Sequence, residues 1–454
     1  MTRPPNILLI TADDMGGDTP GCVGGPPDVT PRLDRLAAEG TTFERAHVAA
    51  AVCQPSRSAI MTGRWPHRNG AEGFEPVRAG VPLLTRLLAA AGYRTGILGK
   101  VTHLQPVEAF GWDLALDRER LGSGRDPAAY AAAVDGFLAD AGDRPWFLMA
   151  NAHDPHRPFS GSDQEREMFS AEQRAGYPAP SRRFDDEPVT VPGFLPDLPE
   201  VRREYREYLA SVRRCDDTVG AVLDAVERAG ATDDTLVVFL SDNGIAVPFA
   251  KANCYVHGSL TPLVVRWPGV TAPGSRVREE FVSALDLFPT FCAAAGVELP
   301  EGLDGTGLGG LLRGTPEPGR SDVVTVFHET AGKRRYEMRC VQDGSTAYIW
   351  NAWSDGDTEY VAENMRGRTW PAMVAAAEDD PALRARVEFY RRRTADELYD
   401  LTADPDCLQD LGADPGWRTA LDDSRTRLLA WMEQVEDPLR AVFRAHLDRS
   451  REPA

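Results

Sequence analysis

Several short runs of apolar, branched side chains along this chain each end in polar residues. Five of them have the length of strands: residues 6–11, 95–98, 146–150, 235–240 and 262–266. Buried parallel strands are continuously apolar, and open sheets bind ligands at the carboxyl ends of such strands. Helical patterns lie between the runs. The sequence therefore predicts an α/β fold in which helices cover both faces of an open sheet.

The pattern also divides the chain into regions. The clearest helical spacing lies between Pro199 and Gly230, which are typical start and stop signals. Residues 159–199 are polar and rich in proline, which predicts a surface excursion that shapes a substrate mouth. Later the alternation changes to short strands. We therefore expect a catalytic domain over residues 1–335 and a smaller α+β domain with an antiparallel sheet over residues 336–454.

Charge limits the partners of this chain. It carries 50 basic and 69 acidic residues and a net charge of −19, which disfavours nucleic acid and anionic membrane surfaces as partners. An anionic substrate must therefore be attracted by a local basic pocket. The basic residues include only three lysines, Lys100, Lys251 and Lys333. A lysine in this chain therefore calls for a local explanation.

The sequence also bears on location. No apolar run approaches the roughly 18 residues of a membrane span, and none near the first residue resembles a signal peptide. The seven cysteines are scattered and contain no CxxC pair. We therefore expect a cytoplasmic protein with reduced thiols.

Two pairs of polar residues follow predicted strands. Asp13 and Asp14 come directly after the first strand, and Asp242 and Asn243 follow the fourth. A parallel sheet would bring the two pairs together, and clustered oxygen ligands favour calcium or magnesium over zinc. The alternative is that both pairs are ordinary turn residues. Spacing alone leaves these two interpretations about equal.

Cys53 begins a segment that is typical of a short helix, with Pro55 in its first turn and Gly63 at its end. The positive end of the helix dipole favours an anionic group at the position of Cys53. The alternative is an inert buried cysteine, which is the commoner fate of this residue type.

The segment Cys53-Gln54-Pro55-Ser56-Arg57, followed by Thr62-Gly63-Arg64, resembles the signature of the type I sulfatases, in which a maturation enzyme oxidises the cysteine to formylglycine. The resemblance extends over nearly the whole chain through Asp13-Asp14, Gly99-Lys100, Ser241-Asp242-Asn243-Gly244 and residues 397–405. Within the family the chain is most similar to the heparan N-sulfatases, or sulfamidases. Three segments carry this narrower likeness: residues 153–157, residues 241–245 with Lys251, and residues 337–342.

The resemblance implies an alkaline-phosphatase-like fold with a large mixed, mostly parallel sheet. It implies one divalent cation, calcium with magnesium as the alternative, held by Asp13, Asp14, Cys53, Asp242 and Asn243. In the catalytic set, Arg57 would steady the hydrated aldehyde, and Lys100 and Lys251 would hold the sulfuryl oxygens. One hydroxyl of the hydrate would attack sulfur, and the other would expel sulfate as the aldehyde re-forms.

Two histidines are assigned to proton transfer by the same resemblance. His103 would be the base for collapse of the hydrate, and His153 would protonate the leaving group. His156 and Arg157 would contact the substrate at the pocket rim, although a solvated arginine in a proline-bounded loop is an equal alternative. Isolated histidines are more often surface or core residues than catalytic ones.

These expectations lead to one predicted function with alternatives. The chain would be a sulfohydrolase that cleaves sulfate from a small N-sulfated or O-sulfated amino sugar, with N-sulfoglucosamine preferred. An ester sulfatase, or a phosphonate or phosphodiester hydrolase, would use the same residues. If Cys53 is not oxidised, the chain would be an inert anion-binding protein. The resemblance also implies a homodimer as one possible assembly.

Overall fold

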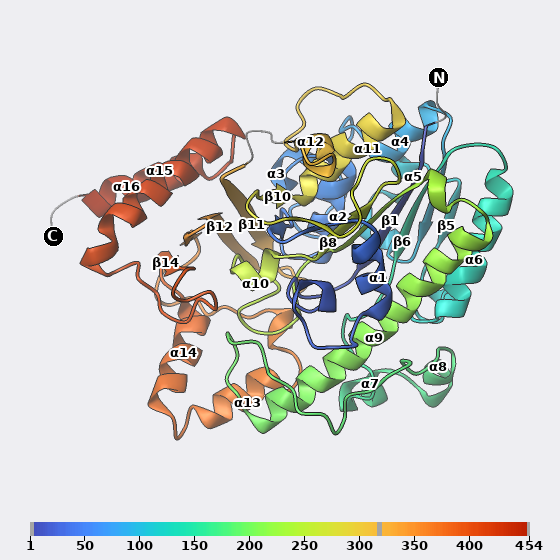
Figure 1. The fold of residues 1–454 in the computed structure, drawn as a ribbon. Coiled ribbons are helices and arrows are strands. Elements are labelled where there is room, and N and C mark those ends of the chain that lie inside the picture. The colour runs from blue at the N-terminus through green and yellow to red at the C-terminus, as the bar shows by residue number, and fades with distance from the viewer. Residues whose placement is uncertain (1–3, 316–319, 452–454) are drawn as a thin grey trace.

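The computed structural model describes residues 4–315 and 320–451 and contains two packed parts (Figure 1). The larger part is built on an eight-stranded sheet with the order β5-β4-β6-β1-β7-β8-β2-β9. Its strands are β1 (Asn6–Ala12), β2 (Thr41–Phe43), β4 (Arg94–Leu98), β5 (Leu114–Leu116), β6 (Trp146–Asn151), β7 (Thr235–Ser241), β8 (Leu263–Arg266) and β9 (Ser275–Val277). A two-stranded pair, β3 (Ala46–His47) and β10 (Val282–Ser283), lies outside this sheet.

Most neighbouring strands of the large sheet are parallel. From β5 through β4, β6 and β1 to β7 every pairing is parallel, whereas β8 runs antiparallel to both β7 and β2. The prediction that grouped residues 262–266 with the parallel strands was therefore wrong about direction. The connection from β7 to β8 contains only the short helix α10 (Val256–Ser259) and no crossover helix, so the chain returns directly from the carboxyl edge.

The side chains of β1 show how helices cover both faces of this sheet. Leu8 and Ile10 pack into one core with α1, α6 and α9, whereas Ile7 and Leu9 pack into a second core with α2, α4 and α11. Both faces are therefore buried, which explains the continuous apolar run. These helices are α1 (Pro31–Glu39), α2 (Cys53–Thr62), α4 (Leu84–Ala90), α6 (Pro127–Ala141), α9 (Pro199–Arg228) and α11 (Leu287–Ala295).

The smaller part is an antiparallel sheet with the order β11-β12-β13-β14. Helices α15 and α16 pack beside it at the left of Figure 1. The elements are β11 (Asp322–Glu329), β12 (Arg335–Asp343), β13 (Thr346–Asn351), β14 (Asp396–Asp400), α13 (Thr369–Ala376), α14 (Pro381–Arg392), α15 (Arg418–Gln434) and α16 (Arg440–Arg451). This arrangement confirms the predicted fold class. The predicted domain boundary after residue 335 falls just inside β12, so it places β11 and the rest of this sheet in different domains.

Other short helices lie in the loops. The proline-rich excursion contains α7 (Asp163–Met168) and α8 (Ala171–Ala175), and the remaining short helices are α3 (Pro66–Asn69), α5 (Val107–Phe110) and α12 (Gly309–Leu312). Within residues 4–315 and 320–451, no helix combines the length and hydrophobicity that crossing a membrane requires.

Candidate active site

The register of two neighbouring strands assembles a cluster of carboxylates. Ala12 of β1 pairs with Ser241 of β7, so the residues that follow each strand emerge side by side at the carboxyl edge. Oxygen atoms of Asp13, Asp14 and Asp242 all lie within 4.8 Å of one another, and all three side chains are buried. The predicted convergence of the two polar pairs is present in the fold.

The oxygens of this cluster suit a hard divalent cation. The side-chain amide of Asn243 donates to Asp14 Oδ1 at 2.8 Å. Among the described residues, Asn243 Oδ1 and Asp14 Oδ2 are buried and have no hydrogen-bond partner. Burial, together with the charges of Asp13 and Asp14, raises the pKa of Asp242 to about 7 even though Arg57 opposes the shift. A bound calcium or magnesium ion would satisfy these oxygens and relieve the repulsion, so the residues fit such an ion.

Cys53 is the first residue of α2, and its side chain lies next to this cluster. Its sulfur lies within 4.8 Å of a carboxylate oxygen of Asp13 and a ring nitrogen of His156. Burial raises the pKa of the Cys53 thiol to about 12, although Lys251 and Lys100 act to lower it. The expected preference for an anionic group at this position stays a prediction.

Arg57 follows Cys53 by one helical turn, so both side chains leave the same face of α2. Its guanidinium is fully buried and lies 2.7 Å from Asp242 Oδ2. The same group donates to Asn151 Oδ1 at 2.6 Å and to Thr11 Oγ1 at 2.7 Å. Asn151 was not among the predicted site residues. It is a polar residue at the end of β6, and that position was the only sequence signal for it.

Two of the three lysines enter the site. Lys100 forms an ion pair with Asp13, and Lys251 forms one with Asp14. Burial acts to raise the pKa of Asp13, but Lys100 and other nearby cations outweigh it, and the pKa lies well below its usual value. Gly99 sets the turn before Lys100: its φ is +69°, and a Cβ there would lie 2.5 Å from the carbonyl oxygen of Asn151.

Three predicted histidines surround the cluster. Burial, reinforced by Lys100, lowers the pKa of His103 to about 2 and that of His153 well below its usual value. Burial also lowers the pKa of His156 to about 4, against the carboxylates of Asp13 and Asp14. All three imidazoles are therefore neutral near pH 7 in the unliganded protein. The rings of His153 and His156 lie 5.2 Å apart between centroids.

His156 and Arg157 occupy different places in the site. The Nε2 atom of His156 lies 4.0 Å from Asp14 Oδ2, and its Nδ1 lies 2.6 Å from the carbonyl oxygen of Arg157. The guanidinium of Arg157 is held by Glu204 at 2.6 Å and by the carbonyl oxygen of Ala246 at 2.9 Å. These contacts use much of its donor capacity, and its predicted contact with substrate stays a prediction.

The loop that carries these histidines is anchored by a residue that the sequence did not reveal. Asp154 is buried and accepts hydrogen bonds from Arg214 at 2.7 Å and from Arg125 at 3.1 Å. Its backbone carbonyl accepts from the amide of Asp13 at 3.3 Å. Asp154 thus links the loop of His153 and His156 to the loop of Asp13 and acts as a positioning residue.

A cavity of about 270 Å³ opens onto these groups. Asp14, Cys53, His103, His156 and Lys251 form its polar floor. Its walls come from distant segments, including the proline-rich excursion and the loop between β13 and α13: Phe74, Arg157, Gln164, Met168, Ala246, Ala331, Glu363 and Arg366. The predicted role of the excursion at the mouth agrees with Gln164 and Met168 lining the cavity.

Known proteins resemble this chain in sequence and fold. The sequence pattern of the family described as Sulfatase matches residues 5–297. Human N-sulphoglucosamine sulphohydrolase is 33% identical, and the alignment covers 96% of this chain and 91% of that protein.

Two solved structures are similar in fold. One is a protein in complex with its substrate, D-glucosamine-2-N,6-O-disulfate, with a TM-score of 0.70 and 20% identity over 96% of this chain and 99% of that chain. The other is the phosphonate monoester hydrolase of Agrobacterium radiobacter, with a TM-score of 0.67 and 21% identity over 95% of this chain and 96% of that chain.

Proposed function

This chain belongs to the sulfatase family of hydrolases, and we propose that it removes sulfate from a small sulfated amino sugar, with N-sulfoglucosamine as the preferred substrate. The observation that carries the proposal is the 33% identity to human N-sulphoglucosamine sulphohydrolase over 96% of the chain. The cluster of oxidised Cys53, Lys100, Lys251 and the carboxylates would supply the nucleophile, the cations and the metal ligands for this reaction.

The proposal includes oxidation of Cys53 to formylglycine by a maturation enzyme. Hydrated formylglycine would supply a hydroxyl nucleophile and a second hydroxyl that releases sulfate, so a stable sulfated residue does not accumulate. The position of Cys53 supports this role, because its side chain lines the cavity and faces a buried lysine. An unmodified thiol with a pKa of about 12 would be a poor nucleophile at neutral pH.

Asp13, Asp14, Asp242 and Asn243 would hold one calcium or magnesium ion together with the modified residue 53. When bound, the ion would neutralise charge on the sulfuryl group and lower the pKa of the nucleophile. The protein contributes a rigid set of buried oxygens at the edge of the sheet. The ion pair with Arg57 fixes the orientation of the Asp242 carboxylate.

The remaining roles belong to cations and imidazoles of this chain. Lys100 and Lys251 would bind sulfuryl oxygens, since both ammonium groups are buried beside the carboxylates. His103 would take a proton from the hydrate because its imidazole is unprotonated, once the anionic sulfuryl group has raised the lowered pKa of that imidazole. His153 would donate a proton to the departing nitrogen or oxygen, after the anionic sulfuryl group has raised the pKa of its imidazole.

Two measurements test the proposal. Intact-peptide mass spectrometry of protein co-expressed with the maturation enzyme should find the peptide of Cys53 lighter by about 18 Da, the change from thiol to aldehyde. That protein should then release sulfate from N-sulfoglucosamine faster than from glucosamine 6-sulfate. A fully unmodified Cys53 in active protein would overturn the formylglycine step, and preference for the 6-sulfate would overturn the substrate assignment.

A second candidate function uses the same residues. Lysines and a divalent cation would also hold a tetrahedral phosphoryl group, so an ester sulfatase or a phosphonate or phosphodiester hydrolase is the alternative. Kinetics on a phosphodiester beside the two glucosamine sulfates separates these activities. A cytoplasmic location and a homodimer remain predictions for this chain.

A further inference from the structure

The loop that carries Lys251 is buried although it has no regular structure. Residues 242–255 lie between β7 and α10, form neither helix nor strand, and are all buried. Phe249 and Ala252, which flank Lys251, each have a φ of +64°, a left-handed conformation that residues with a Cβ adopt rarely. Backbone of this kind persists only where the surrounding structure holds it. The position of Lys251 therefore depends on the contacts of this loop.

One side of the loop is fastened to the segment that leads into Cys53. The amide of Ala252 donates to the carbonyl oxygen of Ala51 at 2.8 Å, and the amide of Lys251 donates to the carbonyl oxygen of Ile245 at 3.1 Å. A buried carbonyl also needs a hydrogen-bond partner. The carbonyl oxygens of Lys251 and Ala252 find theirs in the smaller part of the fold.

Asn364 supplies the first of these partners, 113 residues further along the chain. Its side-chain amide donates to the carbonyl oxygen of Lys251 and, at 2.6 Å, to the hydroxyl oxygen of Tyr390 in α14. The ring of Tyr390 also packs against Phe249, with 4.3 Å between the centroids. In the same region, the hydroxyl of Tyr360 donates to the carbonyl oxygen of Ala252. The loop is thus held from the side opposite Ala51.

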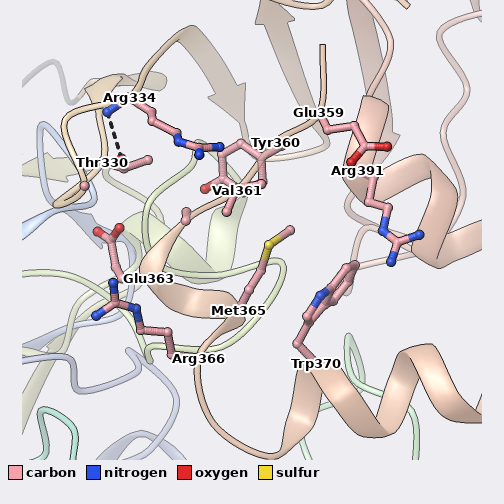
Figure 2. Close-up of a pocket in the computed structure, with 12 residues that line it drawn as sticks. Thr330, Arg334, Glu359, Tyr360, Val361, Glu363, Met365, Arg366, Trp370 and Arg391 are labelled. Atoms are coloured by element: carbon pink, nitrogen blue, oxygen red, sulfur yellow. Dashed lines mark hydrogen bonds between the residues drawn. The ribbon is translucent and has the colours of Figure 1, made fainter. Parts of the chain in front are cut away.

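Asn364 and Tyr390 do not face a ligand. Asn364 lies between Glu363 and Met365, which line the cavity in Figure 2, but Asn364 itself is only 1% exposed. Tyr390 is fully buried, and neither residue lines the active-site cavity. An effect of these two residues on the reaction must therefore pass through the loop of Lys251.

We infer that Asn364 and Tyr390 are positioning residues for the reaction and act by holding the backbone of Lys251. This inference rests on the proposed function, because it assumes that Lys251 binds the sulfuryl group. The Lys251 ammonium lies beside Cys53 and Asp14 at the end of a flexible stem, so a fixed backbone is needed to keep it there. A misplacement of about 1 Å can cost about 10²-fold in rate. The smaller part of the fold thereby completes the active site.

A double-mutant cycle tests this inference. Asn364→Ala and Tyr390→Phe should each lower kcat/KM on N-sulfoglucosamine by about 10–10²-fold in otherwise wild-type enzyme. In the Lys251→Ala background either change should lower it by less than about twofold, because the ammonium that they position is absent. Tyr390→Phe removes a single oxygen atom, so it keeps the test available if Asn364→Ala does not fold.

Tyr93→Phe is the matched control. Tyr93 is also buried, and its hydroxyl donates to the carbonyl oxygen of Pro5 at 2.8 Å, but it lies at the amino end of the sheet, away from the site. This variant should leave kcat/KM unchanged in both backgrounds. Thermal unfolding of each variant shows how much stability the lost hydrogen bond costs.

Two outcomes would overturn the inference: no loss in the wild-type background, or equal losses in both backgrounds. Equal losses would show that Asn364 and Tyr390 act on the fold without Lys251. If wild-type protein does not cleave N-sulfoglucosamine, the proposed function fails. Crystal structures of the wild type and Tyr390→Phe then decide the inference by themselves, because the Lys251 ammonium should move by about 1 Å relative to residue 53, and an unchanged position would refute it.

Discussion

The side-chain nitrogen of Lys251 lies 3.5 Å from the sulfur of Cys53, although 198 residues separate the two in the chain. The same nitrogen forms an ion pair with Asp14, and the lysine is only 2% exposed. One buried cation thus contacts both the proposed nucleophile and a proposed metal ligand. A sulfuryl group that binds between Cys53 and Asp14 would lie next to the positive charge of Lys251.

Replacement of Lys251 by alanine should therefore lower kcat/KM by about 10²–10³-fold, the usual cost of one preorganised donor in the transition state. Lys251→Arg retains the charge and should recover part of this loss. Steady-state kinetics on N-sulfoglucosamine measures both variants, and thermal unfolding checks that they fold. Equal activity of Lys251→Ala and the wild type would exclude a role for this cation in the reaction.

Calcium should stabilise the protein through the buried oxygens at the ends of β1 and β7. At a calcium concentration of 100 times Kd, the free energy of unfolding should rise by about 2.7 kcal/mol. Asn243→Ala removes an unpartnered oxygen without a change of charge and should weaken the effect at the same calcium concentration. Unfolding in calcium and in chelator measures the difference. If calcium stabilises the variant and the wild type equally, Asn243 is not a ligand.

His153 is expected to act according to the leaving group. His153→Ala should lower kcat by about 10²–10⁴-fold with N-sulfoglucosamine, whose nitrogen must gain a proton as it departs. A nitrophenyl sulfate has a leaving group that needs little proton, so its turnover should fall much less. Parallel assays on the two substrates give the comparison. Equal losses on both would assign His153 to binding or structure instead of proton transfer.

Local sequence patterns account for the centre of the site. The apolar runs identify β1 and β7, and once these two strands pair in parallel, Asp13 lies beside Asp242. Spacing alone left the interpretation as turn residues equally open, because the pairing of β1 with β7 depends on the rest of the fold. The helical spacing of Cys53 and Arg57 depends on a single turn, so the sequence was sufficient to predict the helix that carries both.

Relationships that depend on packing between distant segments could not be predicted in this way. The position of Asp154 is fixed by hydrogen bonds from Arg125, which lies in a loop, and from Arg214, which lies in α9. No local pattern marks those arginines as its partners. The direction of β8 was also missed, since a continuous apolar run looks the same in parallel and antiparallel neighbours. A further cavity, of about 530 Å³ (Figure 2), likewise forms only where the β11–β12 hairpin meets the segment that includes Trp370.

A buried ion pair in the smaller part of the fold gives a prediction about pH. Arg339 of β12 lies 2.7 Å from Asp437, which follows α15, and both side chains are fully buried. Burial acts to raise the pKa of Asp437, but Arg339 outweighs it and the pKa lies below its usual value. His67 also contributes to this lowering. The ionised carboxylate is therefore the form that stabilises the fold.

Asp437→Asn should lower the free energy of unfolding by about 3–5 kcal/mol near pH 7, because it leaves the Arg339 charge without its partner. The depressed pKa in the folded state means that the stabilisation is complete above the unfolded value of about 3.9 and is lost as the pH falls through the folded value. Urea unfolding at a series of pH values should therefore show the gap between wild type and variant narrowing below about pH 4. Glu433→Gln, in an exposed pair of α15 with Arg444 of α16, should cost at most about 1 kcal/mol. A gap for Asp437→Asn that stays constant across the series would mean that the charge of Asp437 does not stabilise this junction.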